Sequence, residues 1–230
     1  MEPILAIAAK HHLQVIEDAA QALGATYTFS NGEKRQAGTM GTIGTTSFFP
    51  SKNLGCFGDG GALFTRDAAL AERLRMIANH GQRIKYHHDI IGINSRLDTL
   101  QAAILRVKLK YLSGYTRSRL EVANYYDQHL DTGRVVVPHR SEYSSHVFHQ
   151  YTIRTERRDQ LKKHLENLQI PTMIYYPVPL HLQKAYRQPE YPEGCFPVTE
   201  ELSRSVISLP IHTEMTSEQL AYICQAINTF

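Results

Sequence analysis

The chain has 230 residues, 42% of them hydrophobic and 20% charged, a composition that excludes a disordered protein and allows a sizeable core. The net charge of +3 is mild, and no block of lysines and arginines predicts a nucleic-acid interface. Three cysteines (Cys56, Cys195 and Cys224) form no disulfide framework, and no run reaches the roughly 18 apolar residues of a membrane span. Because residues 1–6 also lack signal-peptide features, we expect a cytoplasmic protein.

The chain begins with a predicted helix and a predicted strand. Residues 3–11 place apolar side chains at helical spacing, and residues 13–18 follow as a buried strand that ends on acidic residues. A helix that leads directly into a strand is the second half of a βαβ unit, whose parallel neighbours must be further strands. We therefore expect the chain to lack the N-terminal strands of its sheet, which would leave strand edges open.

Two further strands are predicted at residues 44–49 and 61–65, joined by a glycine-rich loop at residues 55–61. The loop matches neither a Walker motif nor a G-x-G-x-x-G sequence that opens a helix. Tight turning and close backbone packing are therefore the favoured role of its glycines, rather than a phosphate cradle.

The rest of the chain alternates helix and strand. Residues 80–95 have no clear period, and the pattern predicts the following elements: a helix after the N-cap Asp67, helices at 98–111 and 115–130, a strand at 147–153, a helix at 156–168, a strand at 172–176, a strand at 205–209 and a helix at 217–227. We expect an α/β fold with a mixed, mostly parallel sheet in residues 1–112. A smaller α+β domain is expected in residues 113–230.

Asp18 and Lys52 are the candidate chemical groups. Asp18 ends a strand, where ligands of parallel sheets gather, although a helix N-cap is a competing and compatible interpretation. Lys52 follows Phe48-Phe49 and precedes the glycine-rich loop. A lysine that can hold an aldehyde as a Schiff base, together with a carboxylate that keeps a pyridine nitrogen protonated, is the pairing that a pyridoxal phosphate enzyme needs.

Histidine pairs raise a metal hypothesis that the spacing does not favour. His11-His12 lies at a helix end and His87-His88 lies in a loop. Neither pair has the i, i+4 or Cys-x-x-Cys spacing of a metal site, so no metal is expected.

Several blocks together resemble the DegT/DnrJ/EryC1/StrS sugar aminotransferases, a family of fold-type I pyridoxal phosphate enzymes. The similarity covers nearly the whole chain, in the order and spacing of the family, and is carried by residues 15–25, 44–55, 58–62, 92–98 and 174–181. Compared with the family, we expect this sequence to lack the N-terminal part, so the chain resembles a partial large domain followed by the small C-terminal domain.

The resemblance implies roles for individual residues. Lys52 would form the Schiff base, Asp18 would bind the pyridine nitrogen, Gln21 the ring and Ser47 the phosphate. Asn94 would reach the cofactor phosphate of a neighbouring subunit. Contacts with the sugar across the same interface are implied for three residues: Arg96, Tyr175 and Tyr176. The active unit would then be a homodimer with shared sites.

The implied activity is transfer of an amino group from glutamate to a keto group of a nucleotide-linked sugar. The subgroup most similar overall acts on a UDP-linked 3-keto-hexuronic acid in surface polysaccharide (lipopolysaccharide) synthesis. Lys52 argues against family members that carry histidine there and dehydrate sugars. The alternatives are a catalytically silent remnant that acts only as a dimerising or interaction protein, and a lysine-dependent aldolase or lyase of unrelated fold.

Overall fold

The computed structural model describes all 230 residues and divides into two compact units. The first unit comprises residues 1–117 and 141–149, and the second comprises residues 118–140 and 150–230. The domain division predicted after residue 112 stays a prediction. No helix has both the length and the apolar character needed to cross a bilayer.

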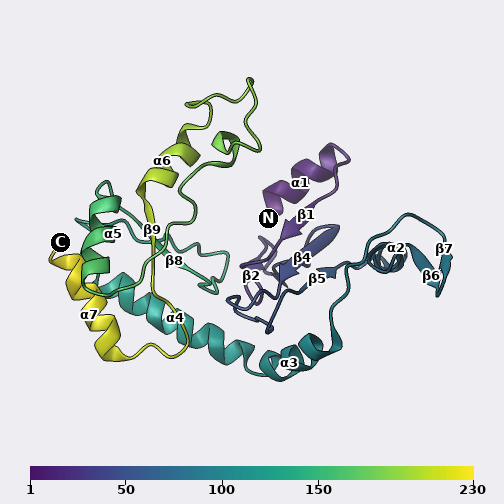
Figure 1. Cartoon of the computed structure of the whole chain (residues 1–230), viewed down its shortest axis with the longest axis horizontal. Helices are drawn as coiled ribbons and strands as arrows, with labels where there is room; N and C mark the ends of the chain where they lie inside the picture. The colour runs from purple at the N-terminus through teal and green to yellow at the C-terminus, as the bar shows by residue number, and fades with distance from the viewer. The chain divides into compact units, whose positions relative to one another are not determined.

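A three-stranded mixed sheet organises the first unit (Figure 1). Helix α1 (Glu2–Lys10) leads to β1 (Ile16–Asp18), which pairs in parallel with β4 (Ile43–Ser47), and β4 pairs antiparallel with β5 (Gly61–Phe64). The prediction of strands near residues 44–49 and 61–65 is thus confirmed. The order β1-β4-β5 places β4 in the centre of the sheet.

The predicted buried strand at residues 13–18 is shorter and more exposed than expected. Only Ile16–Asp18 is a strand, and of its three residues only Glu17 is buried, whereas the Ile16 side chain is 67% exposed. In α1, the helix predicted at residues 3–11, Ala8 is buried while Ile4 and Ile7 are exposed. The periodicity thus predicted the element types correctly but not the burial of the strand.

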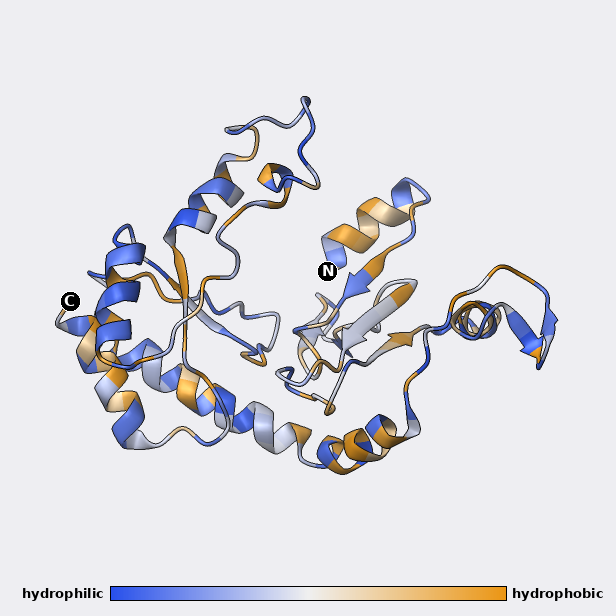
Figure 2. Cartoon of the chain, in the orientation of Figure 1, coloured by the Kyte–Doolittle hydropathy of each residue, from blue (hydrophilic) through white to orange (hydrophobic).

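Two small antiparallel hairpins of the first unit were not predicted. Strand β2 (Thr26–Thr28) pairs with β3 (Lys34–Gln36), and β6 (Gln82–Ile84) pairs with β7 (His87–His88). The expectation that residues 80–95 are irregular is therefore wrong for β6 and β7. Figure 2 shows these two strands as largely hydrophilic, and such short polar strands have no hydrophobic alternation that would reveal them.

Three helices follow the sheet in sequence. Helix α2 (Ala68–Ala78) begins where predicted, because the Asp67 carboxylate accepts hydrogen bonds from the amides of Ala69 and Leu70 at 2.8 and 3.1 Å. Helices α3 (Thr99–Leu109) and α4 (Leu112–His129) confirm the other two predictions. Helix α3 is predominantly hydrophobic in Figure 2, and its Leu105 is buried in a cluster with Phe48, Leu54 and Cys56.

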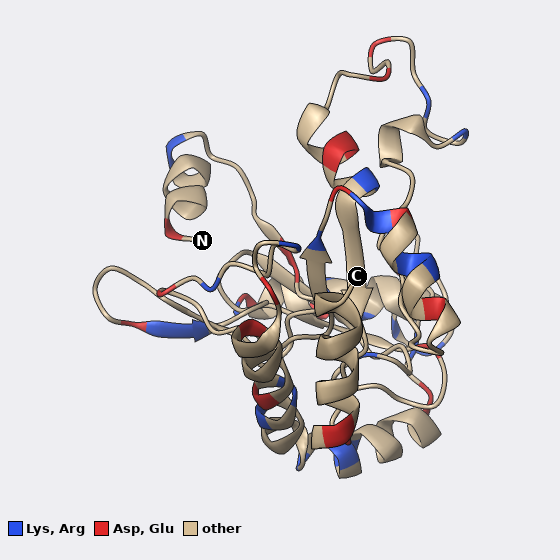
Figure 3. Ribbon diagram, turned by 90° about the vertical axis from the view of Figure 1, so that its left-hand side faces the viewer, with Lys and Arg blue, Asp and Glu red and all other residues tan.

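The second unit has a two-stranded antiparallel sheet, formed by β8 (Tyr151–Arg154) and β9 (Val206–Leu209). The unit also contains the part of α4 from residue 118 onward and four further elements: α5 (Arg158–Asn167), the 3-10 helix η1 (Leu180–Leu182), α6 (Pro197–Ser205) and α7 (Ser217–Asn228). Its fully buried side chains include Tyr126, Tyr151, Ile153, Leu161, Leu165, Ile207 and Ile227. Figure 3 shows positive and negative residues interspersed over the chain.

Two strand predictions in the second half need correction. The strand expected at 147–153 begins only at Tyr151, because Phe148 has a φ of 44°, outside the extended region. The strand expected at 172–176 is a single bridge between Met173 and Ser208. Pro171 and Pro177 flank this segment and cannot donate to a ladder, which explains why β-branched and aromatic residues there do not extend the sheet. Helix α6 was not predicted.

Candidate active site at the carboxyl edge of the sheet

The sheet brings three predicted cofactor residues to one edge. Asp18 is the last residue of β1 and Ser47 the last residue of β4, and these strands run in the same direction. Strand β5 returns antiparallel from Gly61, opposite Ser47, so the connection that contains Lys52 starts and ends at this same edge. Asp18, Ser47 and Lys52 therefore share the carboxyl edge of the parallel pair.

Strand pleating puts Asp18 and Ser47 on the same face of the sheet. Asp18 is opposite Thr45 in the register of β1 and β4, and Ser47 lies two residues beyond Thr45. Side chains two residues apart on a strand point to the same side. Their alternation with the buried Gly44 and Thr46 fits this assignment.

The turn that carries Lys52 is held by the backbone on both sides. The Lys52 amide donates to the carbonyl of Phe49 at 2.9 Å, and the Cys56 amide donates to the carbonyl of Phe48 at 2.8 Å. Phe48 and Leu54, which flank the turn, are both buried. Lys52 itself is half-buried. The turn is thus fixed on the core, with its lysine at the boundary to solvent.

The glycine-rich loop allows close backbone approach, as the sequence predicts. A Cβ on Gly55 would lie 2.3 Å from the carbonyl oxygen of Pro50, and one on Gly61 would lie 2.7 Å from that of Thr46. Both distances are too short for a side chain, and neither glycine has a positive φ. Gly55 therefore closes the Lys52 turn through lack of a side chain rather than through unusual backbone angles.

The polar atoms at this edge fit pyridoxal phosphate. The Lys52 ammonium has no hydrogen-bond or ion-pair partner within the chain, and Asp18 uses only Oδ1, which accepts from the Ala20 amide at 3.0 Å. The Ser47 hydroxyl accepts from the Phe49 amide at 3.2 Å and keeps its hydrogen free to donate. A free amine, a free carboxylate oxygen and a hydroxyl donor are the groups that an aldehyde, a pyridinium and a phosphate require.

The competing interpretation of Asp18 as a helix N-cap is wrong. Residues 20–24 form turns rather than a helix, and the bond from Ala20 to Asp18 closes a local turn of the Asx type. This bond orients the carboxylate at the strand end and still leaves Oδ2 available.

Glu17 is a supporting residue that the sequence analysis did not single out. It is buried, and its carboxylate accepts hydrogen bonds from three amides of the loop before β4: Gly38 at 2.9 Å, and Met40 and Gly41 at 2.5 Å each. Glu17 thereby connects β1 to the segment that leads into β4, and so contributes to the register that pairs Asp18 with Thr45. The available signal was a carboxylate within an otherwise apolar strand, which needs hydrogen-bond donors if buried.

Of the remaining predicted residues, only Gln21 lies near this edge. Gln21 is exposed in the turn after Asp18. Asn94 and Arg96 are exposed beyond β7, where Oδ1 of Asn94 accepts from Nε of Arg96 at 3.1 Å. No hydrogen bond joins them to the sheet edge. Tyr175 and Tyr176 belong to the second unit and are exposed.

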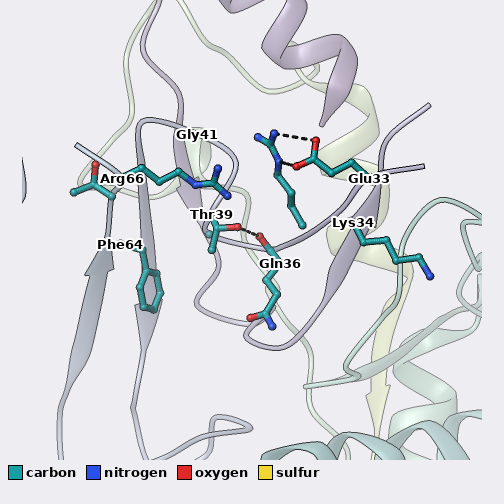
Figure 4. A pocket seen from close by; sticks show the side chains of 10 residues that line it. Glu33, Lys34, Gln36, Thr39, Gly41, Phe64 and Arg66 are labelled. Atoms are coloured by element: carbon teal, nitrogen blue, oxygen red, sulfur yellow. Dashed lines mark hydrogen bonds and ion pairs between the residues drawn. The ribbon is translucent and has the colours of Figure 1, made fainter. Parts of the chain in front are cut away.

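A cavity of about 340 Å³ lies at the opposite edge of the sheet (Figure 4). Its lining includes Gly41, just before β4, and Phe64, the last residue of β5, so it opens at the amino end of β4. A hydrogen bond from Arg35 lowers the pKa of Glu33 below its ordinary value. This cavity is therefore separate from the edge that carries Lys52.

The histidine pairs do not assemble a ligand set. No group of three or more His, Cys, Asp or Glu side chains is arranged to hold a metal ion. Nδ1 of His88 in β7 lies 2.8 Å from the carbonyl oxygen of His80, which precedes β6.

Comparisons with known proteins identify the family and the fold of the chain. The model of the DegT/DnrJ/EryC1/StrS aminotransferase family matches residues 1–228. The chain is 47% identical to a pleiotropic regulatory protein of Geobacillus stearothermophilus and 45% identical to a UDP-N-acetyl-3-dehydro-alpha-D-glucosamine 3-aminotransferase of Acidithiobacillus ferrooxidans, with 100% and 99% of the chain and 61% and 60% of those proteins covered. The crystal structure of S. venezuelae DesV in complex with a ketimine intermediate superposes with a TM-score of 0.93 at 42% identity, covering 100% of the chain and 61% of DesV.

The chain thus spans about 60% of the length of the relatives that it matches. The fold prediction of a fold-type I α/β protein is confirmed by these matches, and so is pyridoxal phosphate as the family's cofactor, since a solved relative holds its pyridoxamine form. The chain belongs to the DegT/DnrJ/EryC1/StrS aminotransferase family.

Proposed function

We propose that this chain provides the pyridoxal phosphate site of a nucleotide-sugar aminotransferase. The observation that carries the proposal is the common edge and face of Asp18 and Ser47, directly before the turn of Lys52. The names of relatives, which include sugar transaminases, support the reaction class.

Bound pyridoxal phosphate supplies an aldehyde for imine formation and a pyridinium ring that accepts an electron pair. Lys52 would hold the aldehyde through its amino group, which has no competing partner within the chain. Asp18 keeps the ring nitrogen protonated, since a carboxylate stabilises the adjacent positive charge. Ser47 donates its hydroxyl hydrogen to the phosphate, and Gln21 contacts the ring.

Lys52 also moves the proton. Its ε-amine would accept the proton from the α-carbon of the amino donor and return it to the C4′ carbon of the cofactor, so that one base would serve both transfers. The half-buried position of Lys52 on a turn fixed by buried neighbours supports this role, because a general base must stay within reach of its proton.

The substrate is a keto-sugar carried on a nucleotide, with glutamate as the amino donor. The finer proposal is a UDP-linked 3-keto-hexuronic acid, supported by the 45% identity to an enzyme named for a UDP-linked 3-dehydro sugar and the 41% identity to one named for a UDP-linked 3-oxo-glucuronate. Arg96, Tyr175 and Tyr176 would contact the sugar. Asn94 would reach the phosphate in the partner subunit of a homodimer, and its exposure leaves the side chain accessible to such a partner.

The test is formation of a covalent adduct at Lys52. The purified chain, incubated with pyridoxal phosphate, should show visible absorbance that borohydride abolishes, and digestion should yield a peptide modified at Lys52. Lys52→Ala should lose both signals. Lys34→Ala, which removes an exposed lysine of β3, is the matched control and should retain them.

A folded chain without an adduct at Lys52 contradicts the proposal. If such a chain still dimerises, the alternative role as a dimerising or interaction protein is favoured. Asp18→Asn should retain the adduct but lose amino transfer, because the neutral side chain no longer holds a proton on the ring nitrogen.

A further inference from the structure

A buried hydrogen-bonded pair, His181 and Glu200, connects the irregular part of the second unit to α6. Nε2 of His181 lies 3.0 Å from Oε1 of Glu200, and the two side chains are only 9% and 5% exposed. An ionised carboxylate can only accept, so Nε2 carries the hydrogen in this bond. Charged groups are rarely buried without several partners, and this pair has them.

Glu200 also binds the C-terminal end of the irregular segment, at residues 194–196. Its two oxygens accept from the Gly194 amide at 2.8 and 2.9 Å, and Oε1 also accepts from the Phe196 amide at 3.3 Å. The rings of His181 and Phe196 pack edge to face, with centroids 4.9 Å apart. One carboxylate therefore joins residue 181 to residues 194–196.

Apart from the contacts with Glu200, no hydrogen bond connects residues 177–195 to a distant part of the chain. Every backbone hydrogen bond donated within residues 177–195 is a local turn, such as Tyr186 to Gln183 and Cys195 to Pro192. Residues 183–199 are exposed. Without Glu200, the order of this stretch would depend on turns alone, which are weak in isolation.

Tyr175 and Tyr176 lie between this pair and a second anchor. Two residues before Tyr175, Met173 exchanges two backbone hydrogen bonds with Ser208 of β9, at 3.2 and 2.8 Å. Five residues after Tyr176 is His181, and the connection contains Pro177 and Pro179, whose rings restrict the backbone. Both anchors thus belong to the continuous stretch α6–β9.

We infer that His181 and Glu200 are positioning residues that fix Tyr175 and Tyr176 for the substrate. The inference rests on the proposed function only for the contact of these tyrosines with the sugar. His181 and Glu200 themselves have no proposed role in the chemical step. Its loss should leave the Lys52 edge intact, because that edge is built from the first unit alone.

Hydrogen exchange of the full chain tests the positioning directly. In Glu200→Ala, the amides of Gly194 and Phe196, which lose their acceptor, and the turn amides of residues 182–195 should exchange about tenfold faster or more, while β8 and β9 stay protected. His181→Ala should raise exchange in the same peptides, and the double variant should exceed Glu200→Ala only slightly, because the two residues act as one pair. Glu201→Ala removes the exposed neighbour on α6 and should change nothing.

Kinetics separate positioning from general stability. With pyridoxal phosphate bound, Glu200→Ala should raise KM for a UDP-linked 3-keto sugar about tenfold with a smaller change in kcat, and Glu200→Gln should recover part of the loss by keeping an acceptor oxygen. Unchanged exchange at Gly194 and Phe196, or an unchanged KM, in Glu200→Ala overturns the inference. Absence of any adduct at Lys52 would defeat the proposed function instead, and the exchange experiment would still decide the role of the pair.

Discussion

Glu17 and Glu200 are two buried glutamates that make the same kind of hydrogen bonds in different surroundings. Each carboxylate accepts hydrogen bonds from the backbone amides of an irregular segment: residues 38–41 for Glu17, and residues 194–196 for Glu200. Glu17 lies within a strand that is itself paired with β4, whereas Glu200 holds a segment with only local turns. The same hydrogen bonds therefore support a sheet in one place and the position of a surface segment in the other.

This difference separates the two halves of the proposed chemistry. The edge with Asp18, Ser47 and Lys52 depends on the strand register and on close backbone packing. The segment with Tyr175 and Tyr176 depends on two anchors on α6–β9. We therefore expect substitutions at the edge with Lys52 to lower the stability of the protein. Substitutions that loosen the segment with Tyr175 and Tyr176 should instead weaken substrate binding.

Glu17→Ala should have the largest effect. It leaves the buried amides of Gly38, Met40 and Gly41 without their acceptor, so we expect a loss on the order of 3 kcal/mol in the free energy of unfolding, and weaker cofactor uptake. Urea denaturation followed by circular dichroism measures it. Glu200→Ala should shift the midpoint much less, and equal shifts in the two variants would contradict the comparison.

Gly55→Ala should have the next largest effect, on the turn itself. The added Cβ meets the Pro50 carbonyl at 2.3 Å, so the backbone must move, at a cost of about 1–3 kcal/mol. Adduct formation at Lys52 should fall with it. Gly114→Ala is the matched control, because a Cβ there meets nothing within 4 Å and removal of a helical glycine should stabilise by about 0.5–1 kcal/mol. A Gly55→Ala protein as stable as wild type would disprove the packing argument.

Lowering the pH should produce the smallest effect, a faster hydrogen exchange confined to residues 183–196. Burial opposes ionisation of Glu200, but the amides of Gly194 and Phe196 and the His181 ring outweigh it and hold the pKa of Glu200 below its usual value. Because the pKa of Glu200 is lowered on folding, the stabilisation that its ionised carboxylate provides is complete above the unfolded-state pKa of about 4.3. It is lost as the pH falls through the lower pKa of the folded state.

Hydrogen exchange at residues 183–196, corrected for the intrinsic pH dependence, should therefore increase below about pH 4. In Glu200→Gln, which cannot titrate, this step should be absent. A wild-type segment with no such step, or a variant that retains it, would show that another group controls the transition.

The sequence by itself determined the features that depend on local pattern. Helical spacing located α2, α3, α4, α5 and α7, the Asp67 cap fixed the start of α2, and the order of blocks identified the family. The glycines after Lys52 correctly predicted close packing, because only a residue without Cβ fits beside the Pro50 carbonyl. The predicted roles of all the site residues stay predictions: Asp18, Gln21, Ser47, Lys52, Asn94, Arg96, Tyr175 and Tyr176.

Only the tertiary structure decided the features that depend on distant partners. The hairpin of β2 and β3, the amides around Glu17 and the pairing of His181 with Glu200 join residues that no periodicity relates. The strand expected at 172–176 failed for the same reason, since its β propensity found one pairing residue, Ser208, between two prolines. Propensity is a property of neighbours along the chain, whereas a buried carboxylate or a strand edge is satisfied by whichever donors the fold brings to it.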